Sequence, residues 1–359
     1  MKSKQLSSKP RSFRPPALER AEQTVARALF RLPARLQFLL SGRKQVALDG
    51  VALDPNMQLM LALTREHGKQ RSLSAESVAK ARSLVRANAL RFAGRAPCVG
   101  EVRELEFDGP AGVLRARHYV PAGNGAPQPL VVFFHGGGFA LCDLDTHDLP
   151  CRELCVRAGV HVLSVEYRLA PEHPYPAAVE DALAAFRFAQ AHASELGADP
   201  DAIAVAGDSA GGNLSAVVAQ RTRHDRPPRL QVLIYPNTDV DRSRPSRTLF
   251  GRGFMLTAAD IDWFDGHYSG GVPREPGYAP LTAADFSGLC PAVIVTCGFD
   301  PLRDEGEAYA RALQAAGNRV DFWREAGLVH GFLHMSPVSP SAEQAMARLA
   351  AAVRAGLIA

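Results

Sequence analysis

Hydrophobic and polar residues follow a repeating strand-then-helix pattern from about residue 130 to the end of the chain. Short apolar runs typical of buried parallel strands are each followed by a longer stretch with apolar residues at helical spacing. Strands are predicted over residues 130–134, 160–167, 202–206, 230–235, 292–297 and 320–325, and helices over residues 147–158, 177–195, 210–222, 303–316 and 341–354. Such alternation predicts an α/β fold, a mostly parallel, twisted sheet with helices on both faces.

Other patterns precede and interrupt this alternation. Two helices come before any strand of the predicted sheet, so we expect them to cover the sheet rather than to build it. Residues 237–288 are rich in Pro, Gly, Arg and aromatic residues and predict an inserted helical excursion. The early elements are helices over residues 48–68, starting near Leu53-Asp54-Pro55, and 72–92, with Asp54 and Ser74 as N-caps, and a hairpin of strands 102–107 and 113–120 around Asp108-Gly109-Pro110.

Positive charge is concentrated in the first 45 residues. This segment holds 11 Lys and Arg against 2 Asp and Glu, a net charge of +9, which leaves −5 for the rest of the 359-residue chain. The slightly acidic remainder does not indicate a nucleic-acid-binding protein. Residues 1–16, rich in Ser, Lys, Arg and Pro, are predicted to be disordered.

Residues 16–42 predict a basic amphipathic helix that Pro33 kinks or splits. Two interpretations of it remain open: peripheral contact with a membrane surface, or an arm packed on the protein with its arginines in water. No apolar run is long enough to span a bilayer, and arginines interrupt every apolar stretch of the N-terminus, unlike a signal peptide. We expect a cytoplasmic protein, with peripheral membrane association as the further possibility.

The six cysteines give no sign of a metal site or of a disulfide framework. None forms a C-x-x-C pair, and none groups with histidines at the spacing of zinc ligands. Cys151 and Cys155 lie one helical turn apart and are best explained as small buried residues. A chain of this length does not need disulfides, so reduced thiols are expected.

A G-x-S-x-G motif at Gly207–Gly211 is the strongest chemical signal in the chain. It follows an apolar strand and precedes a helix, the context of a nucleophile elbow. Side chains at 207 and 211 would collide with neighbouring backbone in so tight a turn, and glycine removes the collision. The turn then presents the Ser209 hydroxyl above the sheet. A Gly-rich turn that binds phosphate or only packs is the alternative for the motif by itself.

A serine nucleophile needs a base and an acid that orients the base. Asp300 and His330 each follow a later predicted strand, and the chain order of serine, aspartate and histidine is that of α/β-hydrolases. Asp304 and Glu305 are rival acids, but they fall within a helix, where caps and ion pairs are the simpler role. His334 is the rival base, about one turn beyond His330.

Acyl transfer also needs N–H donors for the developing oxyanion. The stretch His135-Gly136-Gly137-Gly138 directly follows a strand, and its glycines leave backbone N–H groups free to point into a cavity. We predict the N–H groups of Gly137, Gly138 and Ala210 as the donors. Gly136 is expected as the turn residue, and His135 is expected to brace the loop by a side-chain hydrogen bond.

Five motifs together resemble those of a known enzyme family. They are His135-Gly136-Gly137-Gly138-Phe139, Tyr167-Arg168-Leu169-Ala170-Pro171-Glu172, Gly207-Asp208-Ser209-Ala210-Gly211-Gly212, Asp300-Pro301-Leu302-Arg303-Asp304 and His330-Gly331-Phe332. On these residues the chain resembles the bacterial hormone-sensitive-lipase-like esterases (family IV lipolytic enzymes) of the α/β-hydrolase fold, over roughly residues 48–356. Asp208 and Tyr167 lie in the motifs and are expected to support the site.

The resemblance implies hydrolysis of carboxylic esters with short to medium acyl chains through an acyl-enzyme, with no metal or organic cofactor. It implies a catalytic domain over residues 96–359 and a helical cap from residues 46–95 and part of 237–288. Residues 1–45 have no counterpart in the family. The chain departs from the family at Cys142, where Gly is usual, and at Glu166, where Asp is common and an ion pair with Arg168 is expected.

Two other functions of this fold are compatible with the sequence, and a third alternative is a peripheral membrane protein whose basic helix carries the main function. An amide hydrolase of the same fold would use the same serine, histidine and aspartate. A small-molecule receptor built on this fold with a disabled site is the second, but such a protein is expected to lack the base, and His330 is present.

Overall fold

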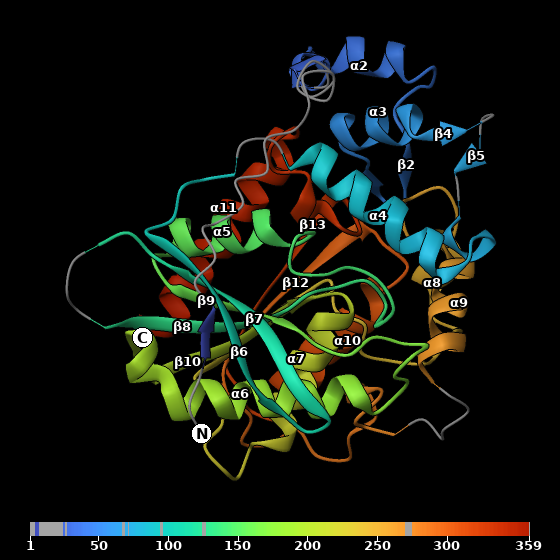
Figure 1. Cartoon of the computed structure of the whole chain (residues 1–359). Helices are drawn as coiled ribbons and strands as arrows, with labels where there is room; N and C mark the ends of the chain where they lie inside the picture. Colours follow the sequence, from blue (N-terminus) through green and yellow to red (C-terminus); the bar gives the residue numbers. More distant parts are fainter. Residues whose placement is uncertain are drawn as a thin grey trace.

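The computed structural model describes residues 4–6, 24–25, 27–66, 69–70, 72–93, 96–123, 127–269 and 275–358. Its centre is a sheet in the order β1-β6-β7-β9-β8-β10-β11-β12-β13 (Figure 1). The strands from β9 to β13 in this order are parallel, and β7, β6 and β1 add an antiparallel edge. The strands are β1 Lys4–Leu6, β6 Glu101–Gly109, β7 Gly112–Val120, β8 Gln128–Phe134, β9 His161–Glu166, β10 Ala198–Asp208, β11 Leu230–Ile234, β12 Ala292–Phe299 and β13 Val320–Val329.

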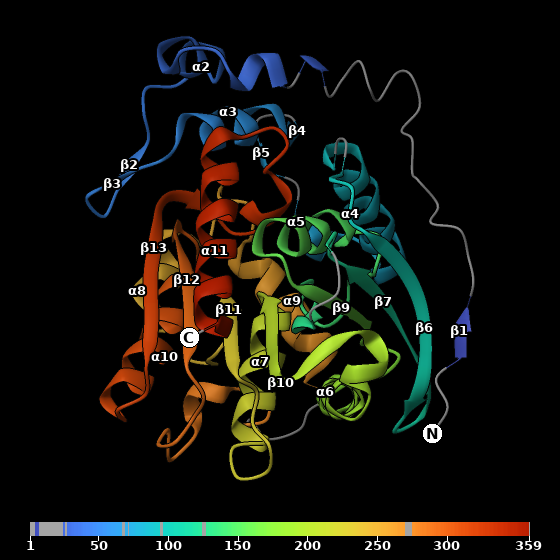
Figure 2. The same ribbon diagram turned by 90° about the vertical axis from the view of Figure 1, so that its left-hand side faces the viewer.

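Helices cover both faces of the sheet, as the alternating pattern predicted. One face carries α5 and α11, and the other carries α6, α7 and α10 (Figure 2). Side chains along β8 alternate between the two layers: Val131 and Phe133 pack toward α5, while Leu130 and Val132 pack toward α6 and α7. The helices are α5 Asp148–Ala158, α6 Ala177–Leu196, α7 Ala210–Arg221, α10 Arg303–Ala315 and α11 Pro340–Ile358.

The segment before the sheet is more divided than predicted. A small hairpin occupies the start of the expected helix 48–68, because Asp49 and Gly50 adopt positive φ and form a tight turn. Asp54 caps α3 as predicted, with its carboxylate accepting the N–H groups of Asn56 and Met57. The elements are α2 Ala34–Leu40, β2 Ala47–Leu48, β3 Val51–Ala52, α3 Pro55–Leu63, β4 Arg65–Glu66, β5 Lys69–Gln70, the 3-10 turn η1 Leu73–Ala75 and α4 Val78–Phe92.

The predicted N-cap at Ser74 is wrong, because α4 begins only at Val78 and its cap is Ser77. Ser74 lies in η1, and its N–H and that of Leu73 donate to Asp260 instead. A distant carboxylate therefore binds the backbone donors that a local cap would have satisfied.

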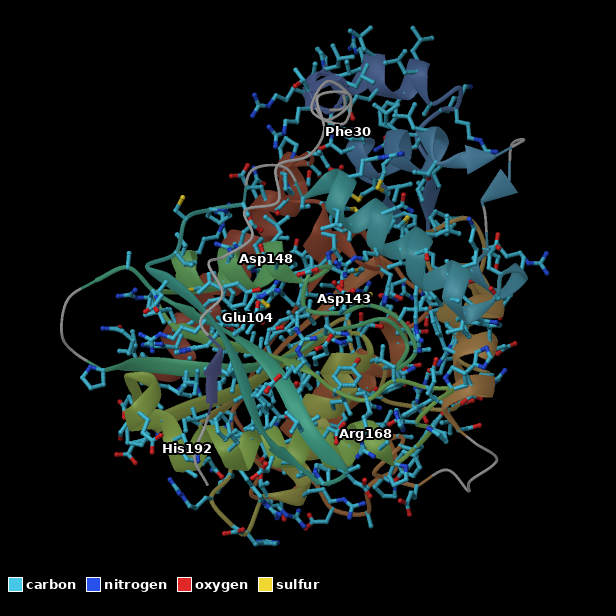
Figure 3. The ribbon with its side chains drawn as sticks, viewed as in Figure 1. Phe30, Glu104, Asp143, Asp148, Arg168 and His192 are labelled. Carbon is cyan, nitrogen blue, oxygen red and sulfur yellow. The ribbon has the colours of Figure 1, made fainter. Side chains whose placement is uncertain are left out.

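The basic N-terminal helix is split at Pro33, as predicted. Helical residues 27–30 end before this proline, which stands as N-cap of α2. Phe30 is buried beneath this turn, at the top of the molecule (Figure 3), and its carbonyl accepts hydrogen bonds from the side chains of Gln37 and Asn56. Lys4–Leu6 pair with β6, contrary to the predicted disorder, and the rest of residues 1–16 lie outside the described part of the chain.

The excursion between β11 and β12 contains α8 Pro245–Leu249, α9 Ala258–Tyr268 and the 3-10 turn η2 Pro280–Thr282. Its helix α9 meets the N-terminal segment through Asp260, which accepts hydrogen bonds from the Ser72 hydroxyl and from the backbone of η1. Two segments almost 190 residues apart therefore lie side by side. Among the described residues, no helix combines the length and apolarity needed to cross a bilayer.

Candidate active site

Ser209 occupies a strained turn between β10 and α7. Its φ of 55° and ψ of −115° lie in a region that residues other than glycine rarely adopt. The flanking glycines are required by close packing, because a Cβ on Gly211 would lie 1.8 Å from the Phe134 carbonyl oxygen and one on Gly207 would lie 2.3 Å from Gly211. The Ser209 N–H donates to the Ile234 carbonyl at 2.9 Å, which ties the turn to β11.

The structure brings Ser209, His330 and Asp300 into one hydrogen-bonded chain. His330 Nε2 lies 3.0 Å from Ser209 Oγ, and His330 Nδ1 lies 2.8 Å from Asp300 Oδ2. Asp300 is fully buried, and its second oxygen accepts the Leu302 N–H at 2.8 Å. Strand β13 extends to Val329, so the predicted loop at 326–329 is strand and His330 follows it directly.

The rival acids and the rival base are not part of the hydrogen-bonded chain of Ser209, His330 and Asp300. Asp304 accepts hydrogen bonds from the Ser246 backbone and from Arg303. Glu305 is buried against Arg247 and accepts the N–H groups of Thr238 and Asp239. His334 packs edge-on against His147, with ring centroids 4.5 Å apart, and burial together with His147 lowers the pKa of His334 to about 3.

The loop after β8, residues 135–142, is called the glycine loop below. Gly137 and Gly138 have φ of 110° and 60°, and both line a cavity together with Ala210 and Ser209. Two residues other than glycine in this loop also have positive φ, Phe139 at 60° and Cys142 at 72°. The loop is therefore strained and depends on its surroundings for its shape.

Residues behind the glycine loop hold its start. His135 Nδ1 lies 2.8 Å from the Gly136 carbonyl, and the Tyr167 hydroxyl donates to the His135 carbonyl at 2.8 Å. The His135 and Tyr167 rings stack with centroids 4.3 Å apart. Burial and the nearby His147 lower the pKa of His135 to about 4, so its imidazole is neutral at physiological pH.

Asp208 forms a second buried polar cluster, beneath the glycine loop. Its carboxylate accepts the Gly136 N–H at 2.9 Å and lies 3.1 Å from His147 Nε2. Burial alone would raise its pKa, but His147 and the Gly136 N–H hold it far below the ordinary value. His147, Asp208 and His334 are a group of donors that could hold a metal ion, with ligand atoms within 4.8 Å of one another. The absence of a metal requirement stays a prediction.

The cavity above Ser209 has a volume of about 240 Å³. Apolar residues that line it come from the N-terminal segment, the glycine loop and α9, and several polar ones come from the residues after β11. The apolar residues include Leu73, Val85, Leu141, Ile261 and Phe264, and the polar ones include Asn237, Asp239, Arg242 and Arg247.

One predicted ion pair is wrong. Glu166 pairs with Arg115 at 3.1 Å, because the two residues lie opposite each other in the register of β9 and β7. Arg168 lies beyond the end of β9 and contacts Asp181 and Glu180 on α6 instead. Cys142, one of the two departures from the family, lines the cavity, and burial raises the pKa of its thiol.

All six cysteines are free, and Cys151 and Cys155 are buried among apolar residues as predicted. Sequence reasoning did not identify His147, Phe264 or Arg82 as neighbours of the site. No local motif marks them, because each comes from a separate segment and meets the glycine loop only in the folded chain.

Comparisons with known proteins agree with this architecture. Residues 131–334 match a family model described as alpha/beta hydrolase fold. The chain is 48% identical over 336 residues to carboxylic ester hydrolase LipN of Mycobacterium tuberculosis, covering 91% of this chain and 89% of that protein. It is 34% identical over 319 residues to ethyl acetate hydrolase of Pseudomonas putida, covering 85% of this chain and 99% of that protein.

A solved structure of an esterase from Pyrobaculum calidifontis, the monoclinic form, superposes with a TM-score of 0.78. Its sequence is 37% identical, and the match covers 86% of this chain and 100% of that one. The family motifs quoted above, the sheet order and these similarities agree. The chain belongs to the α/β-hydrolase fold family, within its hormone-sensitive-lipase-like (family IV) branch of carboxylesterases.

Proposed function

We propose that the protein hydrolyses carboxylic esters of short to medium acyl chain, with Ser209 as nucleophile, His330 as general base and Asp300 as the acid that orients His330. The observation that carries this proposal is the continuous hydrogen-bonded chain from the Ser209 hydroxyl through His330 to the buried Asp300 carboxylate. A catalytically silent receptor would have no need to preserve that chain.

In the proposed mechanism, His330 Nε2 takes the Ser209 proton as the hydroxyl oxygen attacks the ester carbonyl. The N–H groups of Gly137, Gly138 and Ala210 stabilise the negative charge that develops on the carbonyl oxygen. His330 then gives its proton to the departing alcohol, and the acyl group stays on Ser209. Water, activated by the same histidine, attacks the acyl-enzyme and releases the carboxylic acid.

The cavity supports the proposed acyl length. At about 240 Å³ it is smaller than the roughly 300 Å³ at which sites for drug-sized ligands begin. Its apolar wall suits an alkyl chain, and the proposed substrate is therefore a small, largely apolar ester.

A series of p-nitrophenyl esters of increasing acyl length tests the proposal, with Ser209→Ala measured in parallel. We expect turnover that declines for long acyl chains and falls by a factor of about 10³ or more in the variant. Ester turnover that survives in Ser209→Ala would contradict the assignment. Matched amide substrates decide between an esterase and an amide hydrolase of the same fold.

We also propose that residues 46–95 and part of 237–288 form a cap over a catalytic domain of residues 96–359. The proposal is supported by the cavity wall, since Leu73 and Val85 come from the first segment and Ile261 and Phe264 from the second. The hydrogen bonds of Asp260 to η1 link the two parts. Such a cap would exclude water from the acyl pocket.

For the N-terminal extension, residues 1–45, we propose peripheral contact with an anionic membrane surface. Leu36, Leu39 and Leu40 on α2 are exposed, Leu39 to 74%. Residues 24–48 carry five Lys and Arg and no Asp or Glu. Exposed leucines beside arginines suit insertion at an anionic lipid interface.

Co-sedimentation with vesicles of phosphatidylglycerol and phosphatidylcholine tests this contact. We expect the full chain to bind and a chain lacking residues 1–45 to lose binding, with Leu39→Ser intermediate. Equal binding of the full and shortened chains would contradict the proposal.

A further inference from the structure

Two arginines of α4 contact the glycine loop and the residues that directly follow it. Arg82 and Arg86 lie one helical turn apart and face the residues that follow Gly138. Arg86 pairs with Asp143 and Asp145, and Asp143 directly follows the glycine loop, beneath α4 in Figure 3. These contacts join an early helix to the loop that carries the proposed oxyanion donors.

Arg82 uses all three guanidinium nitrogens in this contact. Its Nε donates to the Ala140 carbonyl at 2.8 Å, and Nη2 donates to the Ala170 carbonyl at 2.9 Å. Nη1 and Nη2 also bind the Glu172 carboxylate at 2.8 and 2.7 Å. This bidentate ion pair fixes the plane of the guanidinium, so its remaining donors point at the two carbonyls.

The two carbonyls belong to a closed set of hydrogen bonds around the glycine loop. The Ala170 N–H donates to the Phe139 carbonyl at 2.8 Å, so the segment after β9 and the glycine loop are already paired. Arg82 binds the carbonyl of Ala140, which follows Phe139 in the loop, and the carbonyl of Ala170 itself. Its guanidinium therefore connects the glycine loop to the segment after β9, next to Phe139, whose φ is positive.

Apolar packing places α4 for this role. Ala81 on α4 is fully buried against Ala140 and Leu141, which are also buried. A small residue at 81 lets the helix approach the glycine loop closely enough for Arg82 to reach backbone carbonyls. The strained conformation at Phe139 and Cys142 needs such external contacts to persist.

We propose that Arg82 is a positioning residue for the oxyanion hole, acting from α4 through the Ala140 and Ala170 carbonyls on the N–H groups of Gly137 and Gly138. The inference rests on the proposed function. Arg82 does not need to touch the substrate. Arg82 is expected to stabilise the transition state rather than the bound substrate, because the negatively charged oxygen that needs the N–H donors develops only in the transition state.

Steady-state kinetics on p-nitrophenyl butyrate test the inference with Arg82→Gln, Arg82→Lys and Lys80→Gln. Lys80 is the matched control, a basic residue on the same helix with an exposed side chain. We expect Arg82→Gln to lower kcat by about tenfold or more with little change in KM. Arg82→Lys, which keeps the charge and a single donor nitrogen, should recover part of the loss, and Lys80→Gln should match the wild type.

Inactivation by a p-nitrophenyl phosphonate gives a second readout, because its phosphoryl oxygen needs the same N–H donors. We expect its rate to fall in parallel with kcat. A wild-type kcat in Arg82→Gln, or a raised KM with unchanged kcat, would overturn the inference. If circular dichroism shows that Arg82→Gln does not fold, Arg82→Lys decides, and a wild-type kcat there overturns it as well.

Ser209→Ala is assayed in the same series, so that the two proposals fail in different ways. If the wild type hydrolyses esters and Ser209→Ala does not, the proposed function is supported, whatever the Arg82 variants do. If the wild type shows no ester turnover that depends on Ser209, the proposed function is contradicted. The rate of the phosphonate reaction still reports on the oxyanion donors in that case.

Discussion

The Asp208 carboxylate accepts the Gly136 N–H at 2.9 Å, although the two residues lie 72 positions apart in the chain. This bond joins the nucleophile turn to the start of the glycine loop. The two sit so close that a Cβ on Gly136 would lie 2.5 Å from Asp208 Oδ2. The residue before Ser209 thus holds the loop that is proposed to bind the oxyanion.

Asp208→Ala is expected to lower both stability and kcat. The substitution leaves the Gly136 N–H and His147 without their buried acceptor, a loss of about 1–3 kcal/mol in the free energy of unfolding. Asp208→Asn keeps an acceptor oxygen and should lose less. Urea unfolding and ester kinetics measure both effects. If Asp208→Ala has the same free energy of unfolding and the same kcat as the wild type, Asp208 does not hold the glycine loop in the way described.

Asp300→Asn is expected to lower kcat by a factor of about 10³–10⁴, because an amide cannot hold the His330 tautomer or stabilise its charged form. Asp304→Asn is the matched control, an acid in the same stretch that bonds Ser246 and Arg303. It should retain most activity. The measurement is kcat on a short p-nitrophenyl ester, and the reverse ranking would show that the acid is assigned to the wrong residue.

Phe264→Ala is expected to shift preference toward longer acyl chains. The Phe264 ring lies directly on Gly138, where an added Cβ would come within 2.2 Å of it, and it lines the cavity. Removing the ring should raise the octanoate-to-butyrate ratio of kcat/KM by about tenfold. Trp263→Ala is the control, because the Trp263 ring contacts Phe264, with centroids 5.2 Å apart, but is not among the residues that line the cavity. An unchanged ratio in Phe264→Ala would place the acyl chain elsewhere.

Acid should destabilise the protein through buried neutral histidines. Burial, followed by the neighbouring His161 and Arg103, lowers the pKa of His118 to about 3. An unfolded chain binds the proton near pH 6.5, so His118 stabilises the fold above pH 6.5 and loses this contribution as the pH falls toward 3.

The free energy of unfolding is expected to fall by up to about 1.4 kcal/mol per pH unit for each such histidine. His135 and His334 act in the same direction. Urea unfolding at pH 7, 6 and 5 measures the slope. His118→Gln should reduce it, whereas substitution of His224, whose side chain is exposed, should not. A slope unchanged by His118→Gln would count against the assignment.

Local sequence patterns predicted Ser209, Asp300 and His330, the residues of the proposed active site, because these residues obey local rules. Gly207 and Gly211 are required by the backbone contacts of one tight turn. Asp300 directly follows the buried strand β12, and His330 directly follows β13. Parallel strands end at one edge of the sheet, so residues that follow them meet there whatever the details of packing. The alternation of short apolar runs and amphipathic helices likewise determined the fold class.

Tertiary structure alone decided what surrounds these residues. Ser74 does not cap a helix because Asp260 reaches its backbone, and Glu166 pairs across the sheet with Arg115. Arg82, His147 and Phe264 meet the glycine loop from three separate segments. Each of these partners is determined by how the helices pack. Packing depends on the whole chain, so no short stretch of sequence reveals it.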